Sequence, residues 1–585
     1  MDFASGYTTV TFNPLAILVL LPLIGAAVAA FVKPKSARGW ALGISLATLG
    51  VSLVTAFEFD YTNGSTQYML AGPAVGSIGF SFSLGMDSIS LWLVLLTTLL
   101  MPLAILSSFN SIKERQTSYY AWMQLLLAAM VGVFVAHDLV LFYIFFELTL
   151  IPMFFIIGLW GGPDRRFAAG KFFLFTFTGS VLTLAAAIYV GVKYGTFDIQ
   201  ALTEAARYGR TMTSGVFVPA LTSTERTWVL LGFLAGFAVK VPLFPVHTWL
   251  PLAHTEAPTA GSVILAGVLL KLGTYGLLRL AVPIGMLSAD GLAAEQLHIV
   301  RILGILCVIG IIYGALVAWV QQDIKKLVAY SSVSHLGFCV LGLIALNAQG
   351  VMGSILYMLN HGISTGAMFL TIGMIYDRYH TRDINQLSGL ARRMPIMAFF
   401  FVLFVMASIG LPGTNGFISE FLTILGAFRS PFLGFAYGAF AATGIVLGAV
   451  YMLHMTAKVI FGPLKTPDLH HGSHDETDAH HDSTPGDLSA REIGILVPLA
   501  LAVVVLGVAP LGLMNSMVEQ INDIRRPVVQ ITDEQPGLDV SAQANQIKAP
   551  VVASASQGRL PTASASTPAS NTVALASGMV GTTGR

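Results

Sequence analysis

The sequence has few charged residues, almost no cysteine and no nucleotide-binding motif. Only 10% of its 585 residues are charged, whereas soluble globular domains contain about 25%. A formal net charge of +1 provides no basic excess for binding nucleic acid. The two cysteines, Cys307 and Cys339, form no CxxC pair, and neither GxGxxG after a strand nor GxxxxGK(S/T) occurs. We therefore expect no nucleic-acid partner, and no cofactor or metal bound by this chain.

Long apolar stretches make up most of the sequence, and 55% of its residues are hydrophobic. An α-helix needs about 20 apolar residues to cross about 30 Å of hydrocarbon. We expect an all-α polytopic membrane protein in contact with lipid, with about 14 transmembrane helices. The predicted spans lie near residues 14–32, 39–57, 88–108, 119–136, 138–160, 172–192, 228–250, 259–280, 299–320, 327–346, 350–376, 396–426, 432–460 and 493–514.

Basic residues are concentrated in alternate loops. Lys33, Lys35 and Arg38 follow the first span, and Arg165 and Arg166 follow the fifth. Because short loops rich in Lys and Arg stay on the cytoplasmic side, we expect both termini on the outer face. The simplest location is the inner (cytoplasmic) membrane of a bacterium.

Several segments outside the predicted membrane helices have distinct compositions. Residues 58–86 indicate an outer loop or small hairpin, and 197–227 a short amphipathic helix at the outer surface. The histidines of the inner loop 464–490 either bind metal or are simply solvated. The parts predicted outside the repeats are 1–118 with helices 1–3 and the outer loop, the His-rich loop 464–490, helix 14 at 493–514, and a disordered tail at 527–585.

Two predicted helices are interrupted by proline and glycine, a feature that marks transport sites when it occurs in corresponding halves. The interrupting residues are Pro242, Pro245 and Pro251 in the seventh span, and Pro412, Gly413 and Gly416 in the twelfth. Grouping residues 119–280 and 299–460 places each broken helix fourth in a unit of five. An odd number of helices makes the second unit enter the membrane from the opposite side. We therefore expect two inverted five-helix repeats.

Isolated titratable residues interrupt the apolar spans. A charged side chain at the bilayer centre costs about 2.5–3.5 kcal/mol on insertion scales, so each is a candidate functional residue. The candidates are Glu147, Lys240, Lys271, His335, His361 and Glu420. Because acids, histidines and lysines joined by water form proton relays in membrane pumps, we predict a proton pathway at mid-membrane depth.

Some of these residues also have structural interpretations. No helix break accompanies Lys271, so pairing with an acid is an alternative there. His335 and His361 are suited to hydrogen bonds between helices. His247 and His254 lie toward the inner surface and are further candidates that either feed protons inward or anchor the chain at the interface.

The segments around these residues resemble the antiporter-like subunits of respiratory complex I, the proton-translocating NADH:quinone oxidoreductase. The resemblance extends from about residue 80 to 515 and is greatest to subunit M, also called chain 4. It is carried by FYIFFELTLIPMFFIIGLWGG, FAVKVPLFPVHTWLPLAHTEAPTAGSVILAGVLLKLGTYGLLR, SSVSHLGF, LNHGISTGAMFLTIG and GLPGTNGFISEFL. Glu420 stands where subunits of the L and N types usually have lysine.

The resemblance implies roles for the candidate residues. Glu147 and Lys240 would be the essential acid–lysine pair, Lys271 the bridging lysine, and Glu420 the terminal residue near the outer exit. His335 and His361 would form the central relay between them. The chain would be one pump module beside L-type, N-type and small subunits, driven by quinone reduction elsewhere, with no NADH, flavin or quinone site of its own.

Two classes of alternative remain open at this point. Subunits of Mrp-type cation/proton antiporters and of energy-converting hydrogenases share the relay motifs. The other class is a protein that transports nothing, a scaffold that only holds a membrane arm together. Loss of proton pumping on substitution of Lys240 separates a pump from a scaffold.

Overall fold

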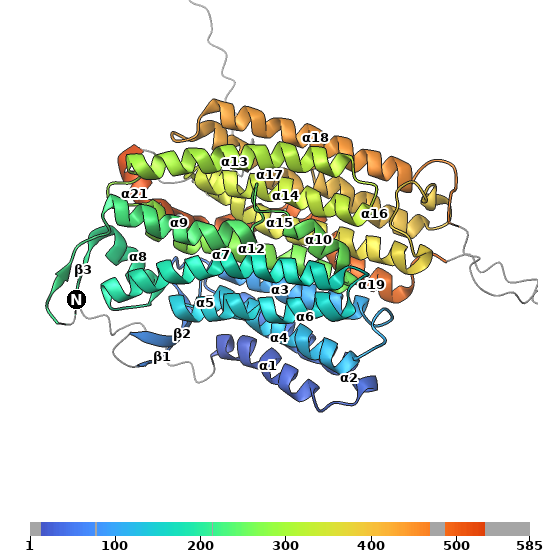
Figure 1. Ribbon diagram of the computed structural model, residues 1–585, viewed down its shortest axis with the longest axis horizontal. Coiled ribbons are helices and arrows are strands. Elements are labelled where there is room, and N and C mark those ends of the chain that lie inside the picture. The colour runs from blue at the N-terminus through green and yellow to red at the C-terminus, as the bar shows by residue number, and fades with distance from the viewer. Residues whose placement is uncertain (1–12, 76–78, 213, 468–485, 533–585) are drawn as a thin grey trace, which may run out of the picture. The chain divides into compact units, whose positions relative to one another are not determined.

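A computed structural model describes residues 13–75, 79–212, 214–467 and 486–532. These residues are mainly helical, and the helices run alongside one another in Figure 1. Eleven helical segments among them are long and apolar enough to cross a membrane. In lipid a helix satisfies its own backbone hydrogen bonds, which explains why apolar runs adopt this structure. The all-α membrane fold is thus confirmed, whereas the count of fourteen spans stays a prediction.

The N-terminal part contains three helices and a hairpin. These are α1 (Pro14–Ala29), α2 (Pro34–Glu58), α3 (Ser88–Ser107) and the antiparallel strands β1 (Gln67–Val75) and β2 (Phe80–Met86). The hairpin confirms the structure predicted within residues 58–86. The predicted amphipathic helix is also present as α8 (Ile199–Tyr208), followed by the short strands β3 (Arg210–Thr211) and β4 (Phe217–Val218).

The two predicted units each occupy five helix positions. The first contains α4 (Gln116–Val135), α5 (Leu139–Leu148), α6 (Leu150–Trp160), α7 (Arg165–Tyr194), α9 (Ser223–Lys240), α10 (Trp249–Glu256), α11 (Thr259–Ile264), η2 (Leu265–Leu269), α12 (Leu270–Gly276) and η3 (Leu277–Met286). The second contains α13 (Ala294–Trp319), α14 (Ile324–Ile344), α15 (Ala348–Tyr379), η4 (Leu390–Arg392), α16 (Pro395–Ser408), α17 (Asn415–Arg429) and α18 (Phe435–Val459). The broken fourth helices are α9/α10 and α16/α17.

A pair of backbone bridges lies at corresponding places in the two predicted units, although the sequences of the units are not visibly alike. In the first unit the start of α5 joins the segment after α7, where Leu139 N donates to Phe197 O at 2.7 Å. In the second unit the start of α14 joins the segment after α15, where Ile324 N donates to Arg382 O at 2.9 Å. Both residues of one bridge are related to those of the other by the same offset along the chain.

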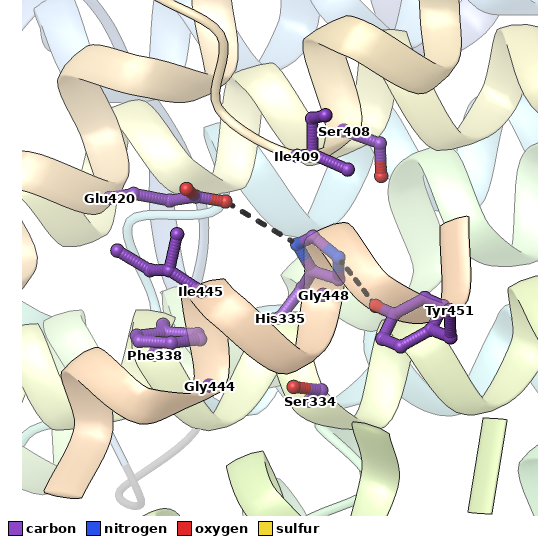
Figure 2. Close-up of a pocket in the computed structure, with 10 residues that line it drawn as sticks. All are labelled: Ser334, His335, Phe338, Ser408, Ile409, Glu420, Gly444, Ile445, Gly448 and Tyr451. Atoms are coloured by element: carbon purple, nitrogen blue, oxygen red, sulfur yellow. Dashed lines mark hydrogen bonds and ion pairs between the residues drawn. The ribbon is translucent and has the colours of Figure 1, made fainter. Parts of the chain in front are cut away.

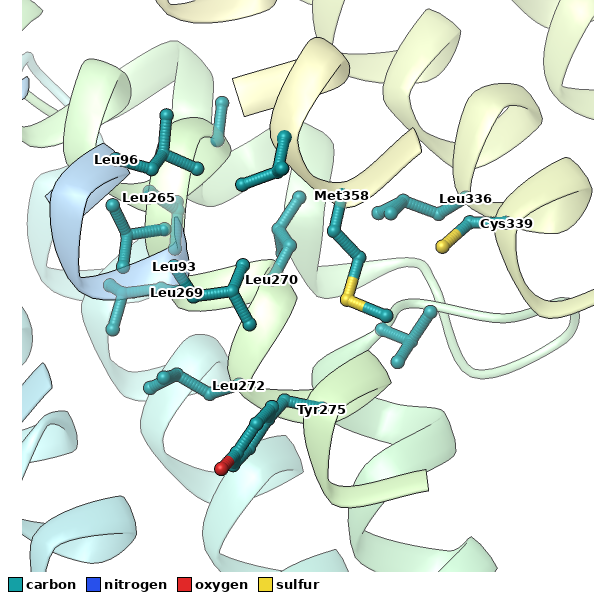
Figure 3. Packing of buried hydrophobic residues seen from close by; sticks show 14 of the residues in the cluster. Leu93, Leu96, Leu265, Leu269, Leu270, Leu272, Tyr275, Leu336, Cys339 and Met358 are labelled. Atoms are coloured by element: carbon teal, nitrogen blue, oxygen red, sulfur yellow. The ribbon is translucent and has the colours of Figure 1, made fainter. Parts of the chain in front are cut away.

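Burial divides the helices into a central group and a peripheral group. The most apolar 18-residue stretch of α15 is entirely buried within the protein, and those of α14 and the α11–η3 segment are almost entirely buried. Helices α2 and α18 leave most of their surface uncovered and lie at opposite edges of the helices in Figure 1. Figure 3 shows the apolar packing around α12, which includes Leu270 and Leu272 of that helix together with Met358 and Cys339. The central helices carry three of the six predicted relay residues: Lys271, His335 and His361.

The chain after the second unit differs from its prediction. Helix α19 (Ala490–Val508) is followed by α20 (Leu511–Asn515) and α21 (Val518–Thr532), so residues 527–532 are helical and the disordered tail does not begin at 527. Helix α21 forms because apolar residues three and four positions apart are buried together; they are Ile521, Ile524 and Val528. Residues 533–585 and most of the His-rich loop (468–485) lie outside the described residues.

Candidate functional site

The predicted relay residues lie inside the protein. Lys271 is fully buried, and Lys240, His335, His361 and Glu420 are each less than a tenth exposed. Glu147 is half-buried. Unpaired charges are rare at such depth because desolvation is expensive, so the partners of each group indicate what it does.

Glu147 and Lys240 form no ion pair in the described part of the chain. Glu147 occupies the end of α5, and its Oε1 has no hydrogen-bond partner in the described part of the chain. The Lys240 ammonium instead donates to the Thr149 hydroxyl at 3.1 Å and lies 4.5 Å from the centre of the Phe146 ring. The two charges still attract each other electrostatically. The described structure therefore shows no direct contact between Glu147 and Lys240, and their pairing stays a prediction.

Lys240 is the last residue of α9, directly before the predicted break. The non-helical stretch covers residues 241–248, and the Trp249 indole donates to the freed carbonyl of Val239 at 2.9 Å. Pro251 was predicted to break the helix, but it lies inside the first turn of α10. Proline is tolerated there because the first-turn N–H groups have no helical partner. The break thus results from the segment that contains Pro242 and Pro245.

The helix that carries Lys271 contains a π-helical turn. The π-helix η2 ends two residues before Lys271, and the ammonium donates to the Ala266 carbonyl at 2.5 Å. It also lies 2.8 Å from Nδ1 of His361 on α15. A π turn often marks a functional site. The helical span Thr259–Met286 is continuous, as predicted, but neither proline nor any other sequence signal marks its π turn.

His335 and Glu420 lie around a small cavity in the second unit. Figure 2 shows His335 between Glu420 and Tyr451, with its Nδ1 4.0 Å from Glu420 Oε1 and its Nε2 3.4 Å from the Tyr451 hydroxyl. The cavity leaves about 10 Å³ for the centre of a water molecule, close to the minimum that holds one water. The rings of His335 and His361 lie 5.6 Å apart without a hydrogen bond between them.

Glu420 is held against the break between α16 and α17. Gly410 has φ +70° in this break, and a Cβ there would lie 2.2 Å from Glu420 Oε2. Gly413 has φ +90° in the same break, with open space around its missing Cβ. Only Gly410 therefore combines a left-handed backbone with contact to the carboxylate.

This difference provides a matched pair of variants. We expect Gly410→Ala to displace the Glu420 carboxylate and to lower proton pumping several-fold. Gly413→Ala bears a similar backbone cost of about 1–2 kcal/mol but leaves the carboxylate in place, so pumping should stay near the unmodified rate. Pumping by reconstituted complex, with assembly followed on native gels, measures both. Equal losses in the two variants would attribute the effect to backbone strain alone.

The two further candidate histidines, His247 and His254, are buried within the protein. His247 packs against Tyr313 and Phe244. His254 is fully buried and stacks on Phe369 with ring centres 4.6 Å apart. Neither ring nitrogen of His254 has a hydrogen-bond partner among the described residues. Proton entry and interfacial anchoring therefore both stay predictions for these two histidines.

Three polar residues at the site were missed from the sequence. Thr149 binds Lys240, and Tyr357 contacts both His335 at 2.8 Å and Glu420 at 3.1 Å. Lys325 lies between two of the predicted spans in sequence, but it is buried at the start of α14 and donates to the Ala257 carbonyl at 2.5 Å. The only available signal was that each lies within a few residues of a predicted relay residue or helix end.

Two family models match most of the described residues. "NADH-ubiquinone oxidoreductase chain 4, amino terminus" matches residues 18–134, and "NADH:quinone oxidoreductase/Mrp antiporter, TM" matches residues 136–446. Subunit M of NADH-quinone oxidoreductase from Rhodobacter capsulatus is 43% identical over 507 residues, which cover 85% of this chain and 93% of the relative. Chain 4 of NADH-ubiquinone oxidoreductase from Prototheca wickerhamii is 40% identical over 520 residues, which cover 86% and 92%.

The chain belongs to the subunit M, or chain 4, family of NADH:quinone oxidoreductase.

Solved structures agree with membership of the subunit M family. A chain of respiratory complex I from Thermus thermophilus superposes with a TM-score of 0.73 at 28% identity, covering 87% of this chain and 99% of that one. A chain of the Mrp complex from Dietzia sp. DQ12-45-1b has a TM-score of 0.74 at 21% identity, covering 89% and 98%, and shows the shared fold alone. The subunit M chain is thus an antiporter-like, multi-pass part of a multi-subunit membrane oxidoreductase, as the sequence predicted.

Proposed function

We propose that this subunit M chain moves protons across the membrane through the groups from Glu147 to Glu420, coupled to quinone reduction elsewhere in the complex. The observation that carries the proposal is a set of titratable side chains inside mainly apolar helices, all of them buried except Glu147, which is half-buried. Such groups are expensive to bury. A structural role alone would favour closed ion pairs, whereas Glu147 and Lys240 are separated.

The proposed path consists of hydrogen-bonded segments with gaps between them. Lys271 contacts His361 directly, and Tyr357 contacts both His335 and Glu420. Lys240 has no direct hydrogen bond to Lys271 in the described structure, so water must carry protons across that gap. The helix break beside Lys240 supports this, because irregular backbone at membrane depth is tolerated where it is buried in protein or lines a water-filled cavity.

The driving force must come from outside this chain. Moving one charge against 100 mV requires about 2.3 kcal/mol. We infer that neighbouring L-type and N-type antiporter-like subunits and small membrane subunits pass on a conformational or electrostatic signal. In this proposal the chain binds no NADH, flavin or quinone. It lies in the inner membrane of a bacterium with both termini on the outer face.

Variants of Glu147 test the first step. Glu147→Ala removes the carboxylate that would recapture the Lys240 ammonium, and we expect pumping to fall by about 10-fold or more, since one positioned proton-transfer group contributes about 10²–10⁴-fold. Glu147→Asp keeps a carboxylate on a shorter side chain and should retain part of the activity. NADH-driven acidification of vesicles containing the complex measures both. Equal activity in the alanine and aspartate variants would contradict an acid–base role for Glu147.

A further inference from the structure

Tyr357 lies between two residues of the proposed relay. It projects from α15, four residues before His361, and is almost fully buried. Its hydroxyl donates to Oε1 of Glu420 at 3.1 Å and lies 2.8 Å from Nδ1 of His335. Within the described residues it is the side chain that bonds to both groups.

Without Tyr357, His335 and Glu420 are too far apart for direct transfer. Their closest charged atoms, Nδ1 and Oε1, are 4.0 Å apart, and hydrogen bonds to nitrogen donors extend to about 3.2 Å. The phenol ring is held in place by stacking on Phe338, with ring planes 7° apart. The hydroxyl is thus fixed where it completes the connection.

The number of protons that each of the three groups can donate fixes the direction of the two hydrogen bonds. A hydroxyl has one proton to donate, and an ionised carboxylate only accepts. When Tyr357 gives its proton to Glu420, the other bond must therefore be donated by Nδ1–H of His335. The chain of donors then points from the histidine to the carboxylate.

We propose that Tyr357 is a relay residue that passes protons between His335 and Glu420, an inference that rests on the proposed pump function. The proton on His335 Nδ1 moves to the phenol oxygen as the phenol proton moves to Glu420 Oε1. Imidazolium and carboxylate become imidazole and carboxylic acid, and the tyrosine is neutral before and after. Rotation of the hydroxyl restores the starting polarity once Glu420 releases its proton.

Two features near His335 offer competing routes. The small cavity borders His335 and Glu420, and one water there would also span them. Tyr451 contacts the other ring nitrogen at the longer distance of 3.4 Å. The geometry favours Tyr357 because a single side chain already makes both bonds.

The test is Tyr357→Phe, which removes only the hydroxyl and keeps the ring that stacks on Phe338. In purified complex reconstituted into liposomes, we expect proton pumping to fall by about 10-fold, within the range for losing one positioned proton-transfer group. Electron transfer from NADH to ferricyanide should be unchanged. The solvent deuterium effect on pumping should rise, because proton transfer across the gap becomes rate-limiting.

Tyr379→Phe is the matched control. Tyr379 is also buried on α15, but its hydroxyl contacts only the Met394 sulfur, at 3.9 Å, in the described structure. We expect this variant to pump at the unmodified rate. Unaltered pumping and an unaltered deuterium effect in Tyr357→Phe would overturn the proposal and favour the cavity water. If Glu420→Gln also pumped normally, the proposed function of this half would fail as well, so the two failures are distinguishable.

Discussion

Replacing Lys240 with alanine is expected to abolish proton pumping while NADH oxidation by an artificial acceptor continues. Lys240 is the last residue of α9, beside the helix break, and in the proposed relay it exchanges a proton with Glu147, so its loss removes one proton-transfer group from the path. We expect pumping below about a tenth of the unmodified rate, since one positioned acid–base group contributes about 10²–10⁴-fold. Acidification of reconstituted vesicles measures pumping, and ferricyanide reduction reports assembly.

The interactions of Lys240 make this loss specific. Its ammonium is held by the Thr149 hydroxyl and the face of the Phe146 ring, both of which remain in the variant. Lys113 is an exposed lysine after α3, and Lys113→Ala should pump normally. If Lys240→Ala pumped as well as Lys113→Ala, the chain would be better described as a scaffold of the membrane arm.

Glu420→Gln is expected to produce a comparable loss at the other end of the path. Glutamine has nearly the same size and still accepts a hydrogen bond from Tyr357, but its amide does not take up a proton in the physiological range. Packing against Gly410 should therefore survive while the proton acceptor is removed. We expect at least about a 10-fold decrease in pumping, measured in the same vesicles.

An exposed glutamate supplies the control for this substitution. Glu114→Gln changes the same functional group in the loop before α4 and should leave pumping unchanged. A Glu420→Gln complex that assembles and pumps normally would show that protons leave by a route that does not include this carboxylate.

The sequence was sufficient to predict the groups that membranes tolerate least. Lys240 and Glu420 are conspicuous because each is a lone charge beside a broken apolar run, and burial in lipid makes such exceptions informative. The same reasoning located both broken helices. It predicted too long a break in the seventh span, because it included Pro251. Pro251 lies in the first turn of α10, where a helix accepts proline.

Other features depend on tertiary packing and were not predictable in this way. Tyr357 and Thr149 are residue types common in membrane helices, and only the approach of a second helix gives their hydroxyls a proton donor or acceptor. Lys325 follows an ordinary helix cap, Asp323, and resembles a loop lysine until α10 is placed beside it. The repeat was inferred from helix counting, whereas the backbone bridges that relate the units have no sequence signal.

The π turn before Lys271 makes the contact between Lys271 and His361 depend on the number of residues in this helix. Ordinary α-helical winding advances each residue by about 100°, so removing one residue between Leu265 and Leu269 would restore regular winding and swing the ammonium away from His361. The lysine therefore finds its partner only because the backbone contains one residue more than a plain helix would need. Insertions and deletions here should be as damaging as replacing the lysine itself.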